Sequence, residues 1–321
     1  MAEDGTHERT LRDVGEFALI DRIVSDVHPK RGIEIGPGDD AAVIACPDGR
    51  VVACVDVLVE NRHFRRDWST AIDVGRRAAA ASLSDVNAMG AVSTALLVGL
   101  VAPADLSTSW LTEAAAGLKE EANNAGAVLV GGDTTEGDAI VLSVTALGNL
   151  EDRAPITRAG AKSGDVFAVC GRLGWAAAGL AVLGRGFRSP KVLVDAHRYP
   201  VIDYAAGPRA AKAGATAMID VSDGLLADLG HIAQASGVAI DVRTQDLEVP
   251  EPLQAAASAY NVDPRTWMLT GGDDHALVAL FPAKKKLPKG FVAIGVAGSG
   301  EPEVTVDGQA FEGATGFTHF A

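Results

Sequence analysis

Short apolar runs rich in β-branched residues alternate with alanine-rich segments along the first half of this chain. Short runs of this kind are typical of buried strands, and longer segments with charges spaced between apolar residues are typical of helices. We therefore expect strands at residues 51–56, 93–101, 127–130 and 139–148, and helices at residues 70–89 and from 107–109 to 126. Gly90 and Gly126 are placed to end the two helices. This alternation predicts a mixed α/β protein.

A polar segment at residues 149–164, with Pro155, Gly160 and Gly164, interrupts the pattern. The chain has 321 residues, which exceeds the roughly 100–200 residues of a typical domain. We place a domain boundary in this segment, between an N-terminal domain at residues 1–149 and a C-terminal α/β domain at residues 150–321. The second half continues with predicted strands at 166–170, 218–221, 238–242, 276–281 and 292–296, and predicted helices at 175–183 and 225–236.

The acidic composition restricts the partners. The formal net charge is −14 at pH 7, whereas a nucleic-acid-binding surface needs clustered positive charge. No apolar run approaches the roughly 18 residues needed to cross a bilayer, and residues 1–16 hold no apolar segment behind a basic start. We expect a cytoplasmic protein that binds neither nucleic acid nor a membrane. The cysteines Cys46, Cys54 and Cys170 form no C-x-x-C pair, so we expect small buried side chains rather than a disulfide or zinc site.

Four glycine-rich segments carry one or two aspartates each, at residues 36–40, 131–134, 220–224 and 271–274. Taken singly, an aspartate beside a glycine is ordinary turn chemistry. All four segments come at the ends of predicted strands, where α/β folds bind ligands, so together they indicate a site. Asp56 and Asp85 are two further acids in apolar surroundings.

The chemistry of these residues points to metal ions and phosphate. Carboxylates that converge without basic partners repel one another unless cations are bound. Magnesium prefers oxygen ligands, and glycine lets the backbone come close to a phosphate. The pattern therefore predicts a site for several Mg²⁺ ions and a triphosphate.

Several other classes are disfavoured by the sequence. It contains no G-x-x-x-x-G-K-[ST], no G-x-S-x-G and no H-E-x-x-H, the signatures of P-loop kinases, common hydrolases and zinc proteases. Gly171-Arg172-Leu173-Gly174 is a poor dinucleotide fingerprint on its own. On the residues alone, His63 is either a loop histidine or a ligand contact, and Arg158 is either a surface charge or a phosphate clamp.

These segments occur in order with others along nearly the whole chain. The others are Gly15-Glu16-Phe17-Ala18-Leu19-Ile20, Leu83-Ser84-Asp85, Arg158-Ala159-Gly160-Ala161 and Gly316-Phe317-Thr318-His319-Phe320. In this order and spacing the chain resembles the thiamine-monophosphate kinase family, within the superfamily that includes aminoimidazole ribonucleotide synthetase and selenophosphate synthetase. The resemblance implies a two-domain, aminoimidazole ribonucleotide synthetase-like architecture. Its N-terminal mixed-sheet domain would bind ATP and magnesium and form a homodimer.

The resemblance also implies an activity and roles for individual residues. The reaction would be the Mg²⁺-dependent phosphorylation of thiamine monophosphate by ATP, the last step of thiamine diphosphate biosynthesis. The metal ligands would be Asp39, Asp40, Asp56, Asp85, Asp133, Asp220 and Asp223. ATP would contact Gly132, Asp133, Arg158 and Ser222, and thiamine monophosphate would contact His63, Asp273 and Phe317. Relatives often carry Ser-Thr or Thr-Thr where this chain has Cys54-Val55, and a glutamate where it has Asp273.

The mechanism expected from this assignment is direct in-line transfer. The acceptor is a phosphate oxygen that is already ionised near neutral pH, so no catalytic side chain is needed beyond those that position metal and phosphate. A phosphorylated His63 is an alternative on sequence alone. Two other functions stay open at this stage: another ATP-using enzyme of the superfamily, such as aminoimidazole ribonucleotide or selenophosphate synthetase, and a non-catalytic Mg²⁺- or Ca²⁺-binding domain.

Overall fold

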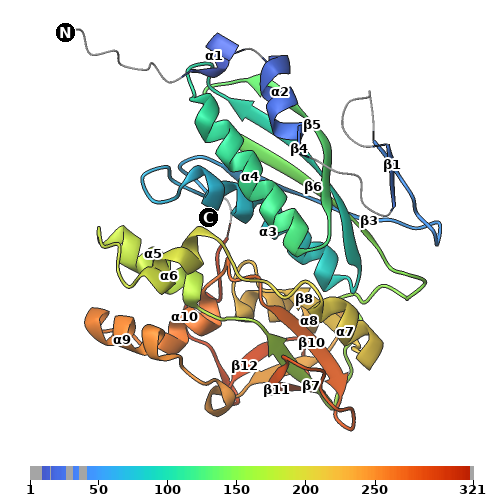
Figure 1. The fold of residues 1–321 in the computed structure, drawn as a ribbon. Helices are drawn as coiled ribbons and strands as arrows, with labels where there is room; N and C mark the ends of the chain where they lie inside the picture. Colours follow the sequence, from blue (N-terminus) through green and yellow to red (C-terminus); the bar gives the residue numbers. More distant parts are fainter. Residues whose placement is uncertain (1–8, 15, 27–31, 36–41, 319–321) are drawn as a thin grey trace. The chain divides into compact units, whose positions relative to one another are not determined.

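The structure is a computed structural model that describes residues 9–14, 16–26, 32–35 and 42–318. The chain divides into two units, each with a principal sheet of its own (Figure 1). Unit 1 comprises Met1–Leu83 and Ser93–Asn149, and unit 2 comprises Ser84–Val92 and Leu150–Ala321.

The principal sheet of unit 1 has four strands in the order β3-β6-β4-β5. Their bounds are β3 (Val52–Val59), β4 (Val92–Ala102), β5 (Val128–Glu136) and β6 (Val141–Asn149). β3 pairs antiparallel with β6, and β4 pairs parallel with β5. Because side chains alternate across a strand, Cys54 and Asp56 leave one face of β3 while Val55 and Val57 leave the other.

Two helices of unit 1, α3 (Ala71–Ala88) and α4 (Thr108–Asn124), pack backbone to backbone. A Cβ atom at Gly75 would lie 1.9 Å from the carbonyl oxygen of Ala114, and one at Gly117 would lie 2.1 Å from that of Ile72. Only glycine allows this approach. The other elements of unit 1 are α1 (Leu11–Val14), α2 (Glu16–Val24), β1 (Ile33–Ile35) and β2 (Val43–Ile44).

Unit 2 is built on a seven-stranded sheet in the order β13-β12-β9-β11-β7-β10-β8. Its strands are β7 (Asp165–Cys170), β8 (Ala217–Asp220), β9 (Ala239–Val242), β10 (Leu277–Pro282), β11 (Val292–Gly298), β12 (Val304–Val306) and β13 (Gln309–Ala310). Its helices are α5 (Trp175–Gly184), α6 (Lys191–Arg198), α7 (Ala206–Ala213), α8 (Leu225–Ser236), α9 (Glu251–Tyr260) and α10 (Pro264–Thr270), with a short 3₁₀ helix η1 (Thr244–Asp246). β10 lies between β7 and β8 and pairs antiparallel with both. Phe167 and Phe281 are fully buried in this core.

The end of α3 is the part of that helix that belongs to unit 2. The side-chain oxygen of Asn87 accepts a hydrogen bond from the backbone N–H of Gly207 at 2.8 Å. The hydroxyl of Ser84 donates to Asp220 at 2.7 Å. The sequence alone groups residues 84–92 with the first domain, and these non-local contacts are the reason that they pack with unit 2.

Most of the predicted elements are confirmed, including α3, α4, β8 and α8. Three interpretations are wrong. Residues 131–134 form part of β5 rather than a turn, because they keep pairing with β4 beyond a register shift. Residues 271–274 follow helix α10, not a strand, since Asp263 caps that helix and Pro264 starts it. Cys46 is exposed, and only Cys170 of the three cysteines is buried.

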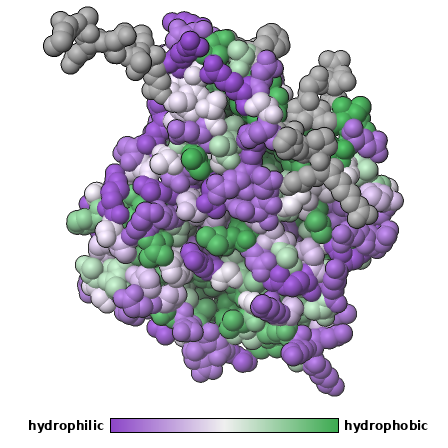
Figure 2. All heavy atoms as spheres, in the orientation of Figure 1, coloured by the Kyte–Doolittle hydropathy of each residue, from purple (hydrophilic) through white to green (hydrophobic). Residues whose placement is uncertain are grey.

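The face drawn in Figure 2 shows many hydrophilic residues with hydrophobic ones interspersed among them. Among the helices that the structure describes, none has both the length and the apolar character needed to cross a membrane.

Candidate functional site

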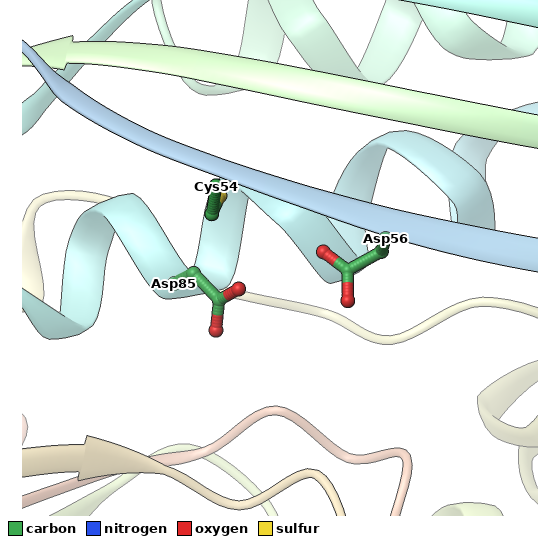
Figure 3. Close-up of side chains that lie close together, drawn as sticks. All are labelled: Cys54, Asp56 and Asp85. Carbon is green, nitrogen blue, oxygen red and sulfur yellow. The ribbon is translucent and has the colours of Figure 1, made fainter.

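Three side chains from β3 and α3 form a group that could hold a metal ion (Figure 3). One ligand atom each from Cys54, Asp56 and Asp85 lies within 4.8 Å of the other two. Cys54 and Asp56 stand two residues apart on β3 and therefore share a face of the strand. Asp85 reaches toward them from the last turns of α3. All three side chains are half-buried.

Ser82 links the strand to the helix. Its hydroxyl lies 2.8 Å from the Oδ2 of Asp56 and 2.8 Å from the carbonyl oxygen of Val144, so two acceptors share one proton. The thiol of Cys54 donates to the carbonyl oxygen of Ser82 at 3.1 Å. Asp85 comes three residues after Ser82 on an unbroken helix, which places it on the same helix face. Ser82 thus holds Asp56 against α3, on the helix face that also carries Asp85.

This donor set suits a divalent cation. Two carboxylates held this close repel each other, and a cation between them removes that cost. Their oxygens are the ligands that Mg²⁺ prefers, whereas the sulfur of Cys54 is a softer donor. Asp56 and Asp85 were predicted from the sequence, while Cys54 and Ser82 were not. The spacing of two residues between Cys54 and Asp56 was the available signal for Cys54.

In unit 2, three segments that are distant in sequence meet at the start of α8. The backbone N–H of Asp273 donates to the carbonyl oxygen of Ser222 at 2.9 Å, and that of Phe317 donates to the carbonyl oxygen of Asp223 at 2.9 Å. The side chains of Ser222, Asp273 and Phe317 are exposed, and that of Asp223 is half-buried. Four residues predicted to bind metal, ATP or substrate therefore share one surface of unit 2.

Two buried carboxylates lie behind these segments. Asp228 accepts hydrogen bonds from the backbone N–H groups of Asp223 and Gly224, both at 3.1 Å. Asp274 accepts from the N–H groups of Trp175 and Ala176 at 3.0 and 2.9 Å, and so caps α5 from outside the helix. Burial is the main reason that the pKa of each rises to about 7, although the backbone donors oppose the rise. Sequence reasoning gave Asp228 no role, and it marked Asp274 only as a member of the 271–274 segment.

Asp220, at the end of β8, has contacts that local sequence patterns do not reveal. Its Oδ2 accepts from the Ser84 hydroxyl at 2.7 Å and lies 2.9 Å from Nδ1 of His275. Burial alone would raise the pKa of Asp220, but these two contacts outweigh it and hold the pKa below its ordinary value. Asp220 is only 5% exposed, so it is the most enclosed of the predicted metal ligands that the structure describes.

Two further predicted residues of unit 1, Gly132 and Asp133, lie away from Cys54 and Asp56 in the sheet. Gly132 and Asp133 are exposed on β5, an edge strand of its sheet, with β4 and β6 between them and β3. A Cβ atom at Gly132 would lie 2.1 Å from the carbonyl oxygen of Val98, so the residue must be small. Asp39 and Asp40 lie outside the described residues.

Arg158 and His63 have structural contacts of their own. The carbonyl oxygen of Arg158 accepts from Ser236 at 2.7 Å, at the end of α8 opposite to Ser222. Because α8 has 12 residues, its two ends are roughly 18 Å apart. Nδ1 of His63 accepts from the N–H of Val59 at 2.9 Å and closes the turn after β3. The ligand roles of both residues stay predictions.

Comparison with known proteins settles the family. Residues 38–150 match the family described as AIR synthase related protein, N-terminal domain. The thiamine-monophosphate kinase of Mycobacterium tuberculosis is 47% identical over 316 residues, which cover 98% of this chain and 94% of that protein. The chain belongs to the thiamine-monophosphate kinase family. It is therefore a kinase.

Solved structures of this family share the fold. The thiamine-monophosphate kinase from Stenotrophomonas maltophilia is 32% identical, with a TM-score of 0.82 over 95% of this chain and 99% of that chain. AaThiL, complexed with AMPPCP and TMP, is 32% identical, with a TM-score of 0.80 over 98% of this chain and 100% of that chain. The predicted mixed α/β, aminoimidazole ribonucleotide synthetase-like fold is confirmed.

Proposed function

We propose that this kinase transfers the γ-phosphoryl group of ATP to thiamine monophosphate, giving ADP and thiamine diphosphate, in a Mg²⁺-dependent reaction that completes thiamine diphosphate biosynthesis. The observation that carries the proposal is the likeness to AaThiL, a protein complexed with AMPPCP and TMP, along 98% of this chain. AMPPCP has the shape of ATP, so that complex pairs an ATP analogue with the acceptor.

The aspartate-rich site supports a direct transfer. A phosphate acceptor is ionised near neutral pH and needs no general base, so the protein has only to align two anions and offset their repulsion. Bound Mg²⁺ would neutralise the charge of the phosphates. Asp56 and Asp85, brought together on β3 and α3, are the ligand pair that the described geometry supports best. The roles of Asp39, Asp40, Asp133, Asp220 and Asp223 as further ligands are part of the proposal.

Substrate contacts are proposed on both units. Gly132, Asp133, Arg158 and Ser222 would contact ATP. His63, Asp273 and Phe317 would contact thiamine monophosphate, with the 52% exposed ring of Phe317 available to stack on the thiamine. The support for the last two is that both are tied by main-chain hydrogen bonds to the loop that carries Asp223.

A homodimer formed through the N-terminal sheet is also part of the proposal. Val55 and Val57, 59% and 47% exposed, lie on the face of β3 opposite to Asp56. Exposed apolar side chains clustered on a sheet face are typical of an interface. We expect the enzyme to act in the cytoplasm.

The test is an acceptor comparison with purified protein and Mg-ATP. Thiamine monophosphate should yield thiamine diphosphate, and unphosphorylated thiamine should yield no product. ATP turnover that requires another acceptor, without thiamine diphosphate, would overturn the proposal in favour of another reaction of the superfamily. Metal binding without any ATP turnover would instead indicate a binding domain.

A further inference from the structure

One buried carboxylate in unit 2 holds the loop on which several predicted site residues depend. Asp228 stands at the fourth position of α8 and is 2% exposed. Its Oδ2 accepts from the N–H groups of both Asp223 and Gly224 at 3.1 Å. Gly224, the N-cap residue of α8, has no side chain with which to cap the helix. Asp228 therefore satisfies two backbone donors that would otherwise lose their partner.

The same loop holds two other segments through its carbonyl groups. The carbonyl oxygen of Ser222 accepts from Asp273, and that of Asp223 accepts from Phe317, each at 2.9 Å. Thus the donors of the loop face Asp228, while its acceptors face the two residues proposed to contact thiamine monophosphate. A shift of the loop would be transmitted to both through single hydrogen bonds.

The packing around the loop leaves little room for adjustment. A Cβ atom at Gly272 would lie 2.2 Å from the carbonyl oxygen of Ser222, and one at Gly316 would lie 2.6 Å from that of Asp223. Backbone segments in such close contact move together, because interiors at this density transmit displacement.

We propose that Asp228 is a positioning residue of this kinase: it sets the geometry of the 222–224 loop and, through it, the placement of Asp273 and Phe317 against thiamine monophosphate. The proposal extends the proposed function and rests on it for its kinetic consequence alone. The carboxylate of Asp228 binds backbone N–H groups, so it would act on the substrate through the loop rather than by direct contact.

The test compares Asp228→Asn and Asp228→Ala with a matched control, Asp165→Asn. Asp165 is also a buried carboxylate of unit 2, 4% exposed, and accepts from the Lys162 N–H at 3.0 Å and from the Thr216 hydroxyl at 2.7 Å. Thr216 immediately precedes β8, whereas Asp223 follows that strand, so the control weakens the unit away from the loop. A general loss of stability would affect all three variants.

We expect the KM for thiamine monophosphate to rise about tenfold or more in Asp228→Ala, because a tenfold change in affinity corresponds to the binding free energy that one good hydrogen bond contributes. The rise should be smaller in Asp228→Asn, which keeps an acceptor oxygen, and absent in Asp165→Asn. Hydrogen–deuterium exchange at the amides of Asp223, Gly224 and Phe317 should accelerate in the Asp228 variants and not in the control.

The exchange measurement tests the positioning role of Asp228 independently of activity. If Asp228→Ala does not fold, the measurement is made on Asp228→Asn alone. Unchanged exchange at these amides in Asp228→Asn and Asp228→Ala would overturn the positioning role. So would an equal rise of the KM in Asp165→Asn, which would mean that stability alone is being measured. If the wild type formed no thiamine diphosphate, the proposed function would be wrong. The exchange result would still test whether Asp228 holds the 222–224 loop.

Discussion

Replacing Asp274 with asparagine should change how the stability of the protein depends on pH. Asp274 is 5% exposed and its pKa is raised to about 7, against an ordinary value of 3.8. A carboxyl group whose pKa is higher in the folded state stabilises the fold while it is protonated, and this contribution is lost as pH rises through the folded pKa. Asparagine has a similar shape and does not titrate, although its single side-chain oxygen can accept only one of the two backbone hydrogen bonds, because Trp175 donates to Oδ2 and Ala176 to Oδ1 of Asp274.

The size of the effect follows from the two pKa values. The difference of about 3 pKa units corresponds to roughly 4 kcal/mol between low pH and pH above 7. Between about pH 5 and pH 8 the wild type should lose roughly 2–3 kcal/mol relative to Asp274→Asn, because the unfolded carboxyl is already ionised at pH 5 while the folded one ionises near pH 7. Other titrating groups, including Asp228, are present in both proteins and largely cancel.

Urea unfolding at several pH values between about 5 and 8, followed by tryptophan fluorescence, measures this difference. The free-energy gap between the two proteins should shift steadily in favour of Asp274→Asn up to about pH 7 and then level off. A gap that does not depend on pH would show that Asp274 is ionised in the fold throughout this range, and that burial does not raise its pKa. Asp274→Ala, which leaves the N–H groups of Trp175 and Ala176 without this acceptor, should be less stable than Asp274→Asn by about 1–3 kcal/mol at pH 5.

Three further predictions follow from the geometry of unit 1. Asp56→Asn should raise the Mg²⁺ concentration needed for half-maximal activity at least about tenfold. Asp105→Asn, at an exposed turn, should leave that concentration unchanged. If both variants needed the same Mg²⁺ concentration, Asp56 would not be a metal ligand. Ser82→Ala should destabilise the fold by about 1–2 kcal/mol in thermal or urea unfolding, because it removes the hydroxyl that holds Asp56. It should also raise the Mg²⁺ concentration needed for activity. A loss of stability without a change in the Mg²⁺ requirement would show that Ser82 does not position Asp56 for the metal. Gly117→Ala should destabilise the protein by about 1–3 kcal/mol or more in urea unfolding, because its Cβ meets the backbone of α3 at 2.1 Å. Gly230→Ala in α8, with open space around the added Cβ, should be neutral or stabilising by up to about 1 kcal/mol. Similar effects at both positions would argue against close packing of α3 and α4.

The sequence was sufficient for the long periodic elements and for the order of the acidic motifs. Helices such as α3 and α8 carry enough apolar periodicity and clear glycine stops to be recognised. Asp56 and Asp85 could be singled out because charged residues stand out in apolar runs. Short helices such as α10 escaped prediction, although Asp263 and Pro264 at its start are a usable N-terminal signal.

Contacts between distant residues account for what the sequence could not provide. Ser84 and His275 are 136 and 55 residues from Asp220, and no local pattern joins them to it. Asp228 looks like an ordinary acid, Asp274 stands out only as part of the 271–274 segment, and the structural role of both follows from their burial beside backbone N–H groups. The prediction of a turn at residues 131–134 is wrong because a parallel partner strand overrides the local preference of glycine.

We propose that this chain moves the γ-phosphoryl group of ATP directly onto thiamine monophosphate. The most direct measurement follows ATP labelled in its γ-phosphate through a reaction with purified protein, thiamine monophosphate and Mg²⁺. We expect the label to appear in the terminal phosphate of thiamine diphosphate, with one ADP formed for each product molecule, and chelation of the metal to stop the transfer. Label that accumulates only as inorganic phosphate, or that remains on the protein as it would on a phosphorylated His63, would contradict this proposal.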